Sequence, residues 1–173
     1  VAFFQKKYIF YYLFFIFLYR FAEGLAMKIA PLFLKDSTEV GGLGLSNEQY
    51  GLVYGTAGTA AFIIGSIVAG YFVSVVGLRK ALFTLACAFN IPFVVYLLFA
   101  YFQPTSLIVI GCGIVGEYFG YGFGFVGLTL FMMQQIAPGK YQMAHYAFAN
   151  SLMNLGVMIP GMLSGYLSKV LGY

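Results

Sequence analysis

Residues 49–78 read QYGLVYGTAGTAAFIIGSIVAGYFVSVVGL, a stretch of thirty positions without a charged side chain. About 18 or more consecutive apolar residues are enough to cross a bilayer as an α-helix. A second uncharged run covers residues 81–116 and has room for parts of two such helices. In neither run do apolar and polar residues alternate, as they do in the strands of a membrane β-barrel. The two runs therefore predict an all-α, polytopic membrane helix bundle.

The composition supports this interpretation, because 62% of the residues are hydrophobic and only 8% are charged. Soluble domains carry about 25% charged residues, so most of this chain's surface is expected to face membrane lipid. The net charge of +4 comes mainly from residues between the apolar runs, so it predicts topology and no nucleic-acid partner. Cys87 and Cys112 lie inside apolar runs, and no His/Cys cluster has metal-ligand spacing. Neither a metal site nor a cofactor is expected.

Polar residues, glycine and proline divide the chain into five predicted helices. Ser46 and Gln49 have the spacing of a capping box and mark the start of the second helix. Asn90 and Pro92 predict a kink inside the third. The expected helices cover residues 6–34, 46–76, 79–101, 105–136 and 140–171.

An internal repeat relates the second helix to the fifth. Residues 65–71 (GSIVAGY) resemble residues 160–166 (PGMLSGY), which lie 95 positions later. The first helix is then expected to have its relative in the fourth, and the third in a helix that would start near position 174. Such a repeat predicts an inverted three-plus-three arrangement of which the last helix is missing here. Coincidence between glycine-rich membrane helices is the alternative.

Basic residues are distributed unequally if consecutive helices alternate in direction. One side then receives Lys6, Lys7, Arg79, Lys80 and Lys140. The other side receives Lys35 and Lys169 together with Asp36, Glu39 and Glu48. Since an excess of Lys and Arg marks the cytoplasmic side, the chain is expected to start inside.

Four charged residues lie inside the predicted helices and away from their ends, and a charge costs about 2.5–3.5 kcal/mol to insert at a helix centre. Arg20, Glu23 and Lys28 lie in the first helix and Glu117 in the fourth. Arg20 and Glu23 are three residues apart and can pair on one helix face. Because Glu117 lies at a similar depth, Arg20 is expected to contact one of the two carboxylates. Two roles remain open, a charge pair that only joins helices and a solvated pathway for substrate or protons.

Further polar residues extend the candidate pathway. Asn150 and Asn154 share one face of the fifth helix, where an interhelical hydrogen bond is the alternative explanation. Glycines recur every fourth residue at 116, 120 and 124, a spacing that favours close helix packing. The complete set of candidate substrate and proton residues is Arg20, Glu23, Lys28, Glu117, Tyr121, Asn150 and Asn154.

The connection between the second and third helices resembles the signature loop of the major facilitator superfamily, roughly G-x-x-x-D-R-x-G-R-R-K. The positions that match are Gly70, Gly77, Arg79 and Lys80. Ser74 and Val75 stand where the signature has an acidic and a basic residue, and Leu78 replaces a base. A gating role that depends on the missing charges is therefore not implied.

Longer stretches resemble the second half of AmpG-type muropeptide permeases. They are residues 20–24 (RFAEG), 42–46 (GLGLS), 116–124 (GEYFGYGFG) and 139–147 (GKYQMAHYA). The resemblance covers nearly the whole chain and implies a twelve-helix fold of two six-helix halves. Residues 1–173 would be the C-terminal half-domain with the seventh to eleventh helices, and the N-terminal half would be absent. The seventh and tenth helices of that fold line the central cavity, where the four charged residues fall.

The function implied by the resemblance is proton-coupled uptake of a cell-wall muropeptide or anhydro-sugar across a bacterial inner membrane. The expected partners are lipid, the small-molecule substrate, protons and the N-terminal half. The first alternative is a transporter of the same fold for another sugar, a peptide or an organic anion. The others are a structural half-bundle and a membrane-embedded enzyme. An enzyme is not favoured, because Glu117 and His145 are the one candidate acid–base pair and their expected depths differ.

Overall fold

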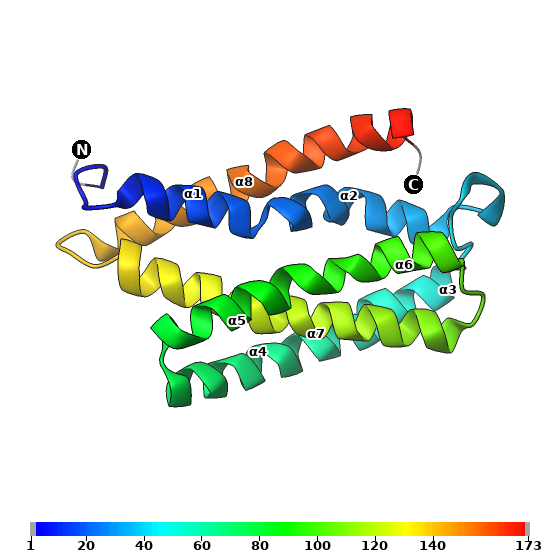
Figure 1. Ribbon diagram of the computed structural model, residues 1–173, viewed down its shortest axis with the longest axis horizontal. Coiled ribbons are helices and arrows are strands. Elements are labelled where there is room, and N and C mark those ends of the chain that lie inside the picture. Colours follow the sequence, from blue (N-terminus) through cyan, green and yellow to red (C-terminus); the bar gives the residue numbers. More distant parts are fainter. Residues whose placement is uncertain (1–2, 172–173) are drawn as a thin grey trace.

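The computed structural model describes residues 3–171, and every regular element in that range is helical (Figure 1). The helices follow one another as α1 (Ile9–Tyr19), α2 (Phe21–Lys35), η1 (Thr38–Val40), α3 (Asn47–Tyr50), η2 (Gly51–Ala57), α4 (Gly58–Val76), α5 (Leu78–Asn90), η3 (Ile91–Phe93), α6 (Val94–Phe102), α7 (Leu107–Phe131), η4 (Met132–Ile136) and α8 (Gln142–Leu171). The elements η1 and η3 are short 3₁₀ turns, whereas η2 and η4 are π-helical.

Four continuous helical stretches are long and apolar enough to cross a membrane: Ile9–Lys35, Asn47–Val76, Leu78–Phe102 and Leu107–Ile136. They correspond to the first four predicted helices and confirm an all-α chain with membrane-spanning segments. The fifth predicted span, α8, has 30 residues but is not among them in the described part of the chain. It is long enough, but two asparagines, three serines and Pro160 lower its apolar character. The four spans identify the chain as an integral membrane protein.

Two interruptions divide the predicted helices. The kink predicted at Asn90 and Pro92 is confirmed, since α5 ends at Asn90 and η3 separates it from α6. The break at Arg20 was not predicted, although Ile9–Lys35 still forms one continuous span that corresponds to the helix expected over residues 6–34. Arg20 has φ −102° and ψ 5°, which ends α1 and begins α2. These angles lie in the sparsely populated bridge region, where functional residues are often found.

Long helix pairs build the bundle. The most extensive packing joins α4 to α7, and α5–α7 and α2–α8 follow with contacts of similar extent (Figure 1). A Cβ atom on Gly122 would lie only 2.1 Å from the carbonyl oxygen of Phe62, so α7 needs glycine there to approach α4. The Ser66 hydroxyl donates a hydrogen bond across the same contact to the carbonyl of Gly122, at 3.2 Å. Small residues thus allow backbone-to-backbone contact within the membrane.

The predicted glycine stripe of the fourth helix packs only in part. Cβ atoms on Gly120 and Gly124 would clash with the backbone oxygens of Ala88 and Leu85, at 2.4 and 2.6 Å. Gly116 has no atom within 4 Å of such a position. Two members of the stripe therefore hold α7 against α5, while the third faces open space.

The predicted ends of two helices are confirmed. The capping box is present, because the Ser46 hydroxyl accepts a hydrogen bond from Gln49 N and the Gln49 side chain accepts one from Ser46 N.

The connection between α4 and α5, whose sequence resembles the signature loop of the major facilitator superfamily, is too short to form a loop. Gly77 alone separates α4 from α5 and has φ +82°, which favours glycine. Gly70 lies inside α4, and Arg79 and Lys80 lie in the first turn of α5.

The two ends of the bundle differ in charge. The N-terminal segment and the α4–α5 and α7–α8 connections lie at one end, on the left of Figure 1. This end, hereafter the basic end, carries Lys6, Lys7, Arg79, Lys80 and Lys140. The opposite end carries the α2–α3 and α6–α7 connections with Asp36, Glu39 and Glu48. The grouping expected from alternating helices is therefore present, although the side chain of Lys169 lies outside the described residues.

Candidate functional site

Three of the four charged residues that lie away from the ends of the spans are buried. Arg20, Glu23 and Glu117 are 7%, 4% and 5% exposed. The prediction that Arg20 contacts a carboxylate is confirmed, because its guanidinium donates from Nε and Nη2 to the two carboxylate oxygens of Glu23. The guanidinium carbon also lies 5.6 Å from the ring centre of Phe125. This two-bond geometry is the strongest that an Arg–carboxylate pair can adopt.

A tyrosine links this ion pair to α7. The Tyr121 hydroxyl donates a hydrogen bond to Glu23 Oε1 at 3.0 Å, which joins α7 to α2. One turn further along α7, the carbonyl of Gly124 accepts a bond of 2.7 Å from the Tyr19 hydroxyl of α1. The break at Arg20 thus lies between two hydrogen bonds to α7, and both carboxylate oxygens of Glu23 accept hydrogen bonds.

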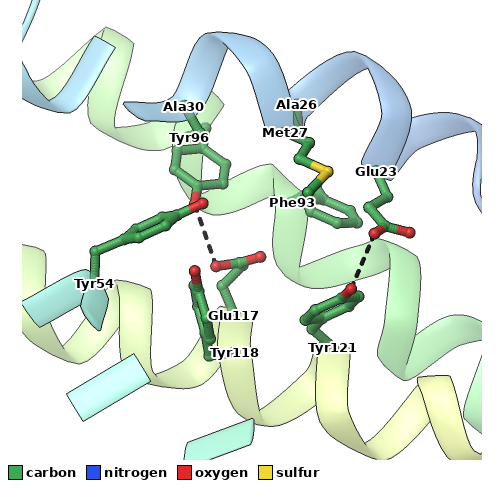
Figure 2. Close-up of a pocket in the computed structure, with 10 residues that line it drawn as sticks. All are labelled: Glu23, Ala26, Met27, Ala30, Tyr54, Phe93, Tyr96, Glu117, Tyr118 and Tyr121. Atoms are coloured by element: carbon green, nitrogen blue, oxygen red, sulfur yellow. Dashed lines mark hydrogen bonds between the residues drawn. The ribbon is translucent and has the colours of Figure 1, made fainter. Parts of the chain in front are cut away.

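Glu117 has a different environment. Its Oε2 accepts a hydrogen bond of 3.2 Å from the Tyr96 hydroxyl of α6. No cation of the described chain pairs with it. Figure 2 shows Tyr54 and Tyr118 also pointing toward this carboxylate, with their rings edge to face at 5.0 Å between centres. Glu117 is therefore a buried acid surrounded by tyrosines and without a counter-charge.

Both carboxylates line one small pocket between α2, η2, α6 and α7 (Figure 2). Its volume of about 70 Å³ is sufficient for a few water molecules but not for a sugar. The lining residues are Glu23, Ala26, Met27, Ala30, Tyr54, Phe93, Tyr96, Glu117, Tyr118 and Tyr121. In the described conformation the pocket can hold water, a proton or a small cation beside Glu117.

The remaining candidate residues lie elsewhere. Lys28 and Asn154 line a separate groove of about 350 Å³ between α2 and α8, which Arg20 also borders. Lys28 is exposed and has no ion pair within the described residues. The interhelical hydrogen bond suggested for Asn150 and Asn154 is not formed, because neither amide bonds to another described residue. Asn150 is half-buried and Asn154 is exposed.

Sequence reasoning missed Tyr54, Tyr96 and Tyr118. They come from three helices, and nothing in their spacing indicates that they meet at Glu117. The candidate pair of Glu117 and His145 is not brought together. His145 packs on Phe3 and Tyr141 beside the α7–α8 connection, whereas Glu117 lies mid-way along α7. The described residues also contain no group of three His, Cys, Asp or Glu side chains that could hold a metal ion.

Comparison with known proteins gives one informative similarity. The chain is 26% identical over 180 residues to an uncharacterized protein of Haemophilus influenzae strain Rd. The alignment includes 99% of this chain but 41% of the relative, so the chain spans less than half of that protein's length. No family model and no solved structure matches the chain.

Proposed function

We propose that the intact protein is a secondary active transporter and that this chain forms part of its substrate and proton pathway. The observation that carries the proposal is Glu117, a carboxylate buried in the bundle without a cationic partner and beside a pocket of water size. An ionisable group within the membrane is retained at a cost and usually serves transport of ions, protons or substrates.

A purely structural role explains the other acid better than it explains Glu117. Arg20 and Glu23 neutralise one another, and together with Tyr121 they join α2 to α7. An ion pair that only joins two helices needs no second carboxylate. Glu117 adds an uncompensated charge or a bound proton, and a neutral amide could accept its hydrogen bond from Tyr96 of α6 equally well. This difference favours a pathway over a static half-bundle.

Helix packing supports assignment to the major facilitator superfamily. The first predicted helix packs on the fifth, and the second packs on the fourth. A two-fold axis that exchanges the first helix with the fourth, and the second helix with the fifth, requires this pairing. One contact from each of these two helix pairs follows the same rule. A Cβ on Gly65 would lie 2.3 Å from the oxygen of Phe119, and one on Gly24 would lie 3.0 Å from Pro160 Cβ. The internal repeat relates these two contacts, because Gly65 corresponds to Pro160 and Gly24 corresponds to Phe119, each 95 positions later.

The same symmetry suggests where a sixth helix of this half would pack. The contact of α5 with α7 has its counterpart on α2, where an apolar groove of about 590 Å³ runs between α2 and α6. Ala22, Ala26 and Ala30 of α2 line it at four-residue intervals. The H. influenzae relative is more than twice as long as the aligned region, which leaves room for such a helix and for a second half.

We propose a muropeptide or anhydro-sugar as the cargo, taken up with protons across a bacterial inner membrane. The resemblance to AmpG-type permeases supports the cargo, and Glu117 supports proton coupling. Because the pocket beside Glu117 is too small for a sugar, the cargo would bind in a larger cavity completed by the remainder of the protein. Lys28, which is exposed and unpaired in the α2–α8 groove, favours an organic anion as a second candidate cargo.

The test is uptake by the intact protein in vesicles with an imposed proton gradient. The Glu117→Gln variant should lose accumulation of labelled anhydro-muropeptide but keep part of its downhill exchange, since the amide preserves size but cannot carry the proton. Glu39→Gln, which changes an exposed acid of η1 between the spans, is the matched control and should accumulate normally. Unchanged accumulation in Glu117→Gln would remove Glu117 from coupling. Competition by unlabelled peptides, sugars and organic anions would then identify the cargo.

A further inference from the structure

A further groove lies at the basic end, away from the carboxylates. It has a volume of about 500 Å³ and is formed where the α4–α5 connection meets the end of α7. Arg79 and Lys80 line one side and Gln134 and Gln135 the other. The π-helical turn η4 widens the end of α7, and two consecutive glutamines border the groove there.

The polar side chains of this groove are free. All four are exposed, and none forms an ion pair or hydrogen bond with another described residue. The other bases of this end are partly engaged: Lys6 donates to the carbonyls of Ile136 and Pro138, and Lys7 and Lys140 lie over tyrosine rings. The five acids of the chain are Glu23, Asp36, Glu39, Glu48 and Glu117, and none belongs to the basic end. The positive charge of Arg79 and Lys80 is therefore uncompensated.

The groove also has apolar walls. Leu82 and Phe131 line it, and Phe83, the next residue of α5, is 79% exposed on the surface of a membrane-spanning helix. Two cations and two amides thus lie at the end of the spans, directly beside a surface that lipid chains cover. The amide N–H groups in the first turn of α5 add a favourable helix dipole for an anion.

We infer that this groove binds the headgroup of an anionic phospholipid. Arg79 and Lys80 pair with the phosphate, Gln134 and Gln135 donate to phosphate or headgroup oxygens, and the acyl chains extend along α5. Basic pockets between membrane helices at the cytoplasmic face bind anionic headgroups in this way. Charge complementarity identifies the occupant, because a zwitterionic lipid would leave the two cations uncompensated. The inference rests on membrane insertion and on the charge of this end, not on the transport proposal.

The experiment is lipid binding to the purified intact protein in neutral detergent, followed by native mass spectrometry. Phosphatidylglycerol and phosphatidylcholine with identical chains are the two probes. The unmodified protein should bind phosphatidylglycerol at least about tenfold more tightly, and the preference should weaken with salt. Each basic residue near a lipid headgroup contributes about fivefold to binding, so Arg79→Gln with Lys80→Gln should weaken binding by about 30-fold.

A matched double variant separates a site from general surface charge. Lys7→Gln with Lys140→Gln removes the same charge from the same end but outside the groove, and its binding should change less than about threefold. An equal loss in both double variants, or no preference in the unmodified protein, would overturn the inference. Displacement of phosphatidylglycerol by equimolar inorganic phosphate would identify a site for free anions instead. If Arg79→Gln with Lys80→Gln lowers the melting temperature but leaves lipid binding intact, another part of the protein occupies the groove.

Discussion

At the scale of single residues, the two buried carboxylates are distinguished by their partners. Glu23 receives two bonds from Arg20 and one from Tyr121, whereas Glu117 receives one from Tyr96. The spacing of Arg20 and Glu23 made their pairing one of two outcomes predicted from the sequence, with Glu117 as the other candidate partner of Arg20. The Tyr96 contact was not predictable, because Tyr96 and Glu117 are 21 positions apart on different helices. A tyrosine in an apolar helix gives no sign of which buried acid it will meet.

The ion pair makes a prediction about stability. Glu23→Ala should destabilise the protein by about 3–5 kcal/mol, because it leaves the Arg20 guanidinium buried without a counter-charge. Replacing both residues, as Arg20→Leu with Glu23→Leu, should recover most of that loss, since no unpaired charge remains. Thermal unfolding in detergent, followed by circular dichroism, measures both effects. Equal destabilisation in the single and double variants would contradict an ion pair that mainly neutralises itself.

At the scale of helices, an interruption of a helix was predictable only where a residue in the sequence enforces it. The other interruptions depend on tertiary contacts. The kink near Asn90 was predictable because proline at position 92 cannot donate a backbone hydrogen bond. The capping box was predictable because its bonds are local. The break at Arg20 and the π turns η2 and η4 carry no comparable signal. They lie beside the pocket of Glu23 and Glu117 and the groove of Arg79 and Lys80, where packing against other helices determines the backbone conformation.

Glycine substitution tests how α4 and α7 pack. Gly122→Ala should lower stability by about 1–3 kcal/mol, because the added methyl would meet the backbone oxygen of Phe62 at 2.1 Å and backbone cannot easily yield. Gly116→Ala in the same helix has open space around the new atom and is the control. It should be neutral or stabilising by up to about 1 kcal/mol, since alanine favours helix. Melting temperatures of the two variants that do not differ would show that the two helices are not in backbone contact.

At the scale of the whole molecule, antiparallel helices bring all five basic residues of the basic end together. This arrangement predicts which side of the membrane each connection faces. A positive end faces the cytoplasm because Lys and Arg are retained there during insertion. The α4–α5 and α7–α8 connections should therefore be cytoplasmic, and the segment with Asp36 and Glu39 should be on the opposite side. Lys35 and Lys169 do not reverse the balance, because they stand against five basic residues at the basic end.

Single-cysteine labelling in intact cells tests the orientation without altering any charge. Cys87 and Cys112 are first replaced by alanine, since Cys112 is exposed. Thr38→Cys and Gln142→Cys then place one exposed thiol at each end of the bundle. A membrane-impermeant maleimide should label Thr38→Cys in intact cells, and should label Gln142→Cys only after the membrane is opened. The reverse pattern would place the basic end outside and would also remove the groove of Arg79 and Lys80 from the cytoplasmic leaflet. Labelling of both thiols from outside would mean that an even number of spans separates them, which is incompatible with the three crossings formed by Asn47–Val76, Leu78–Phe102 and Leu107–Ile136.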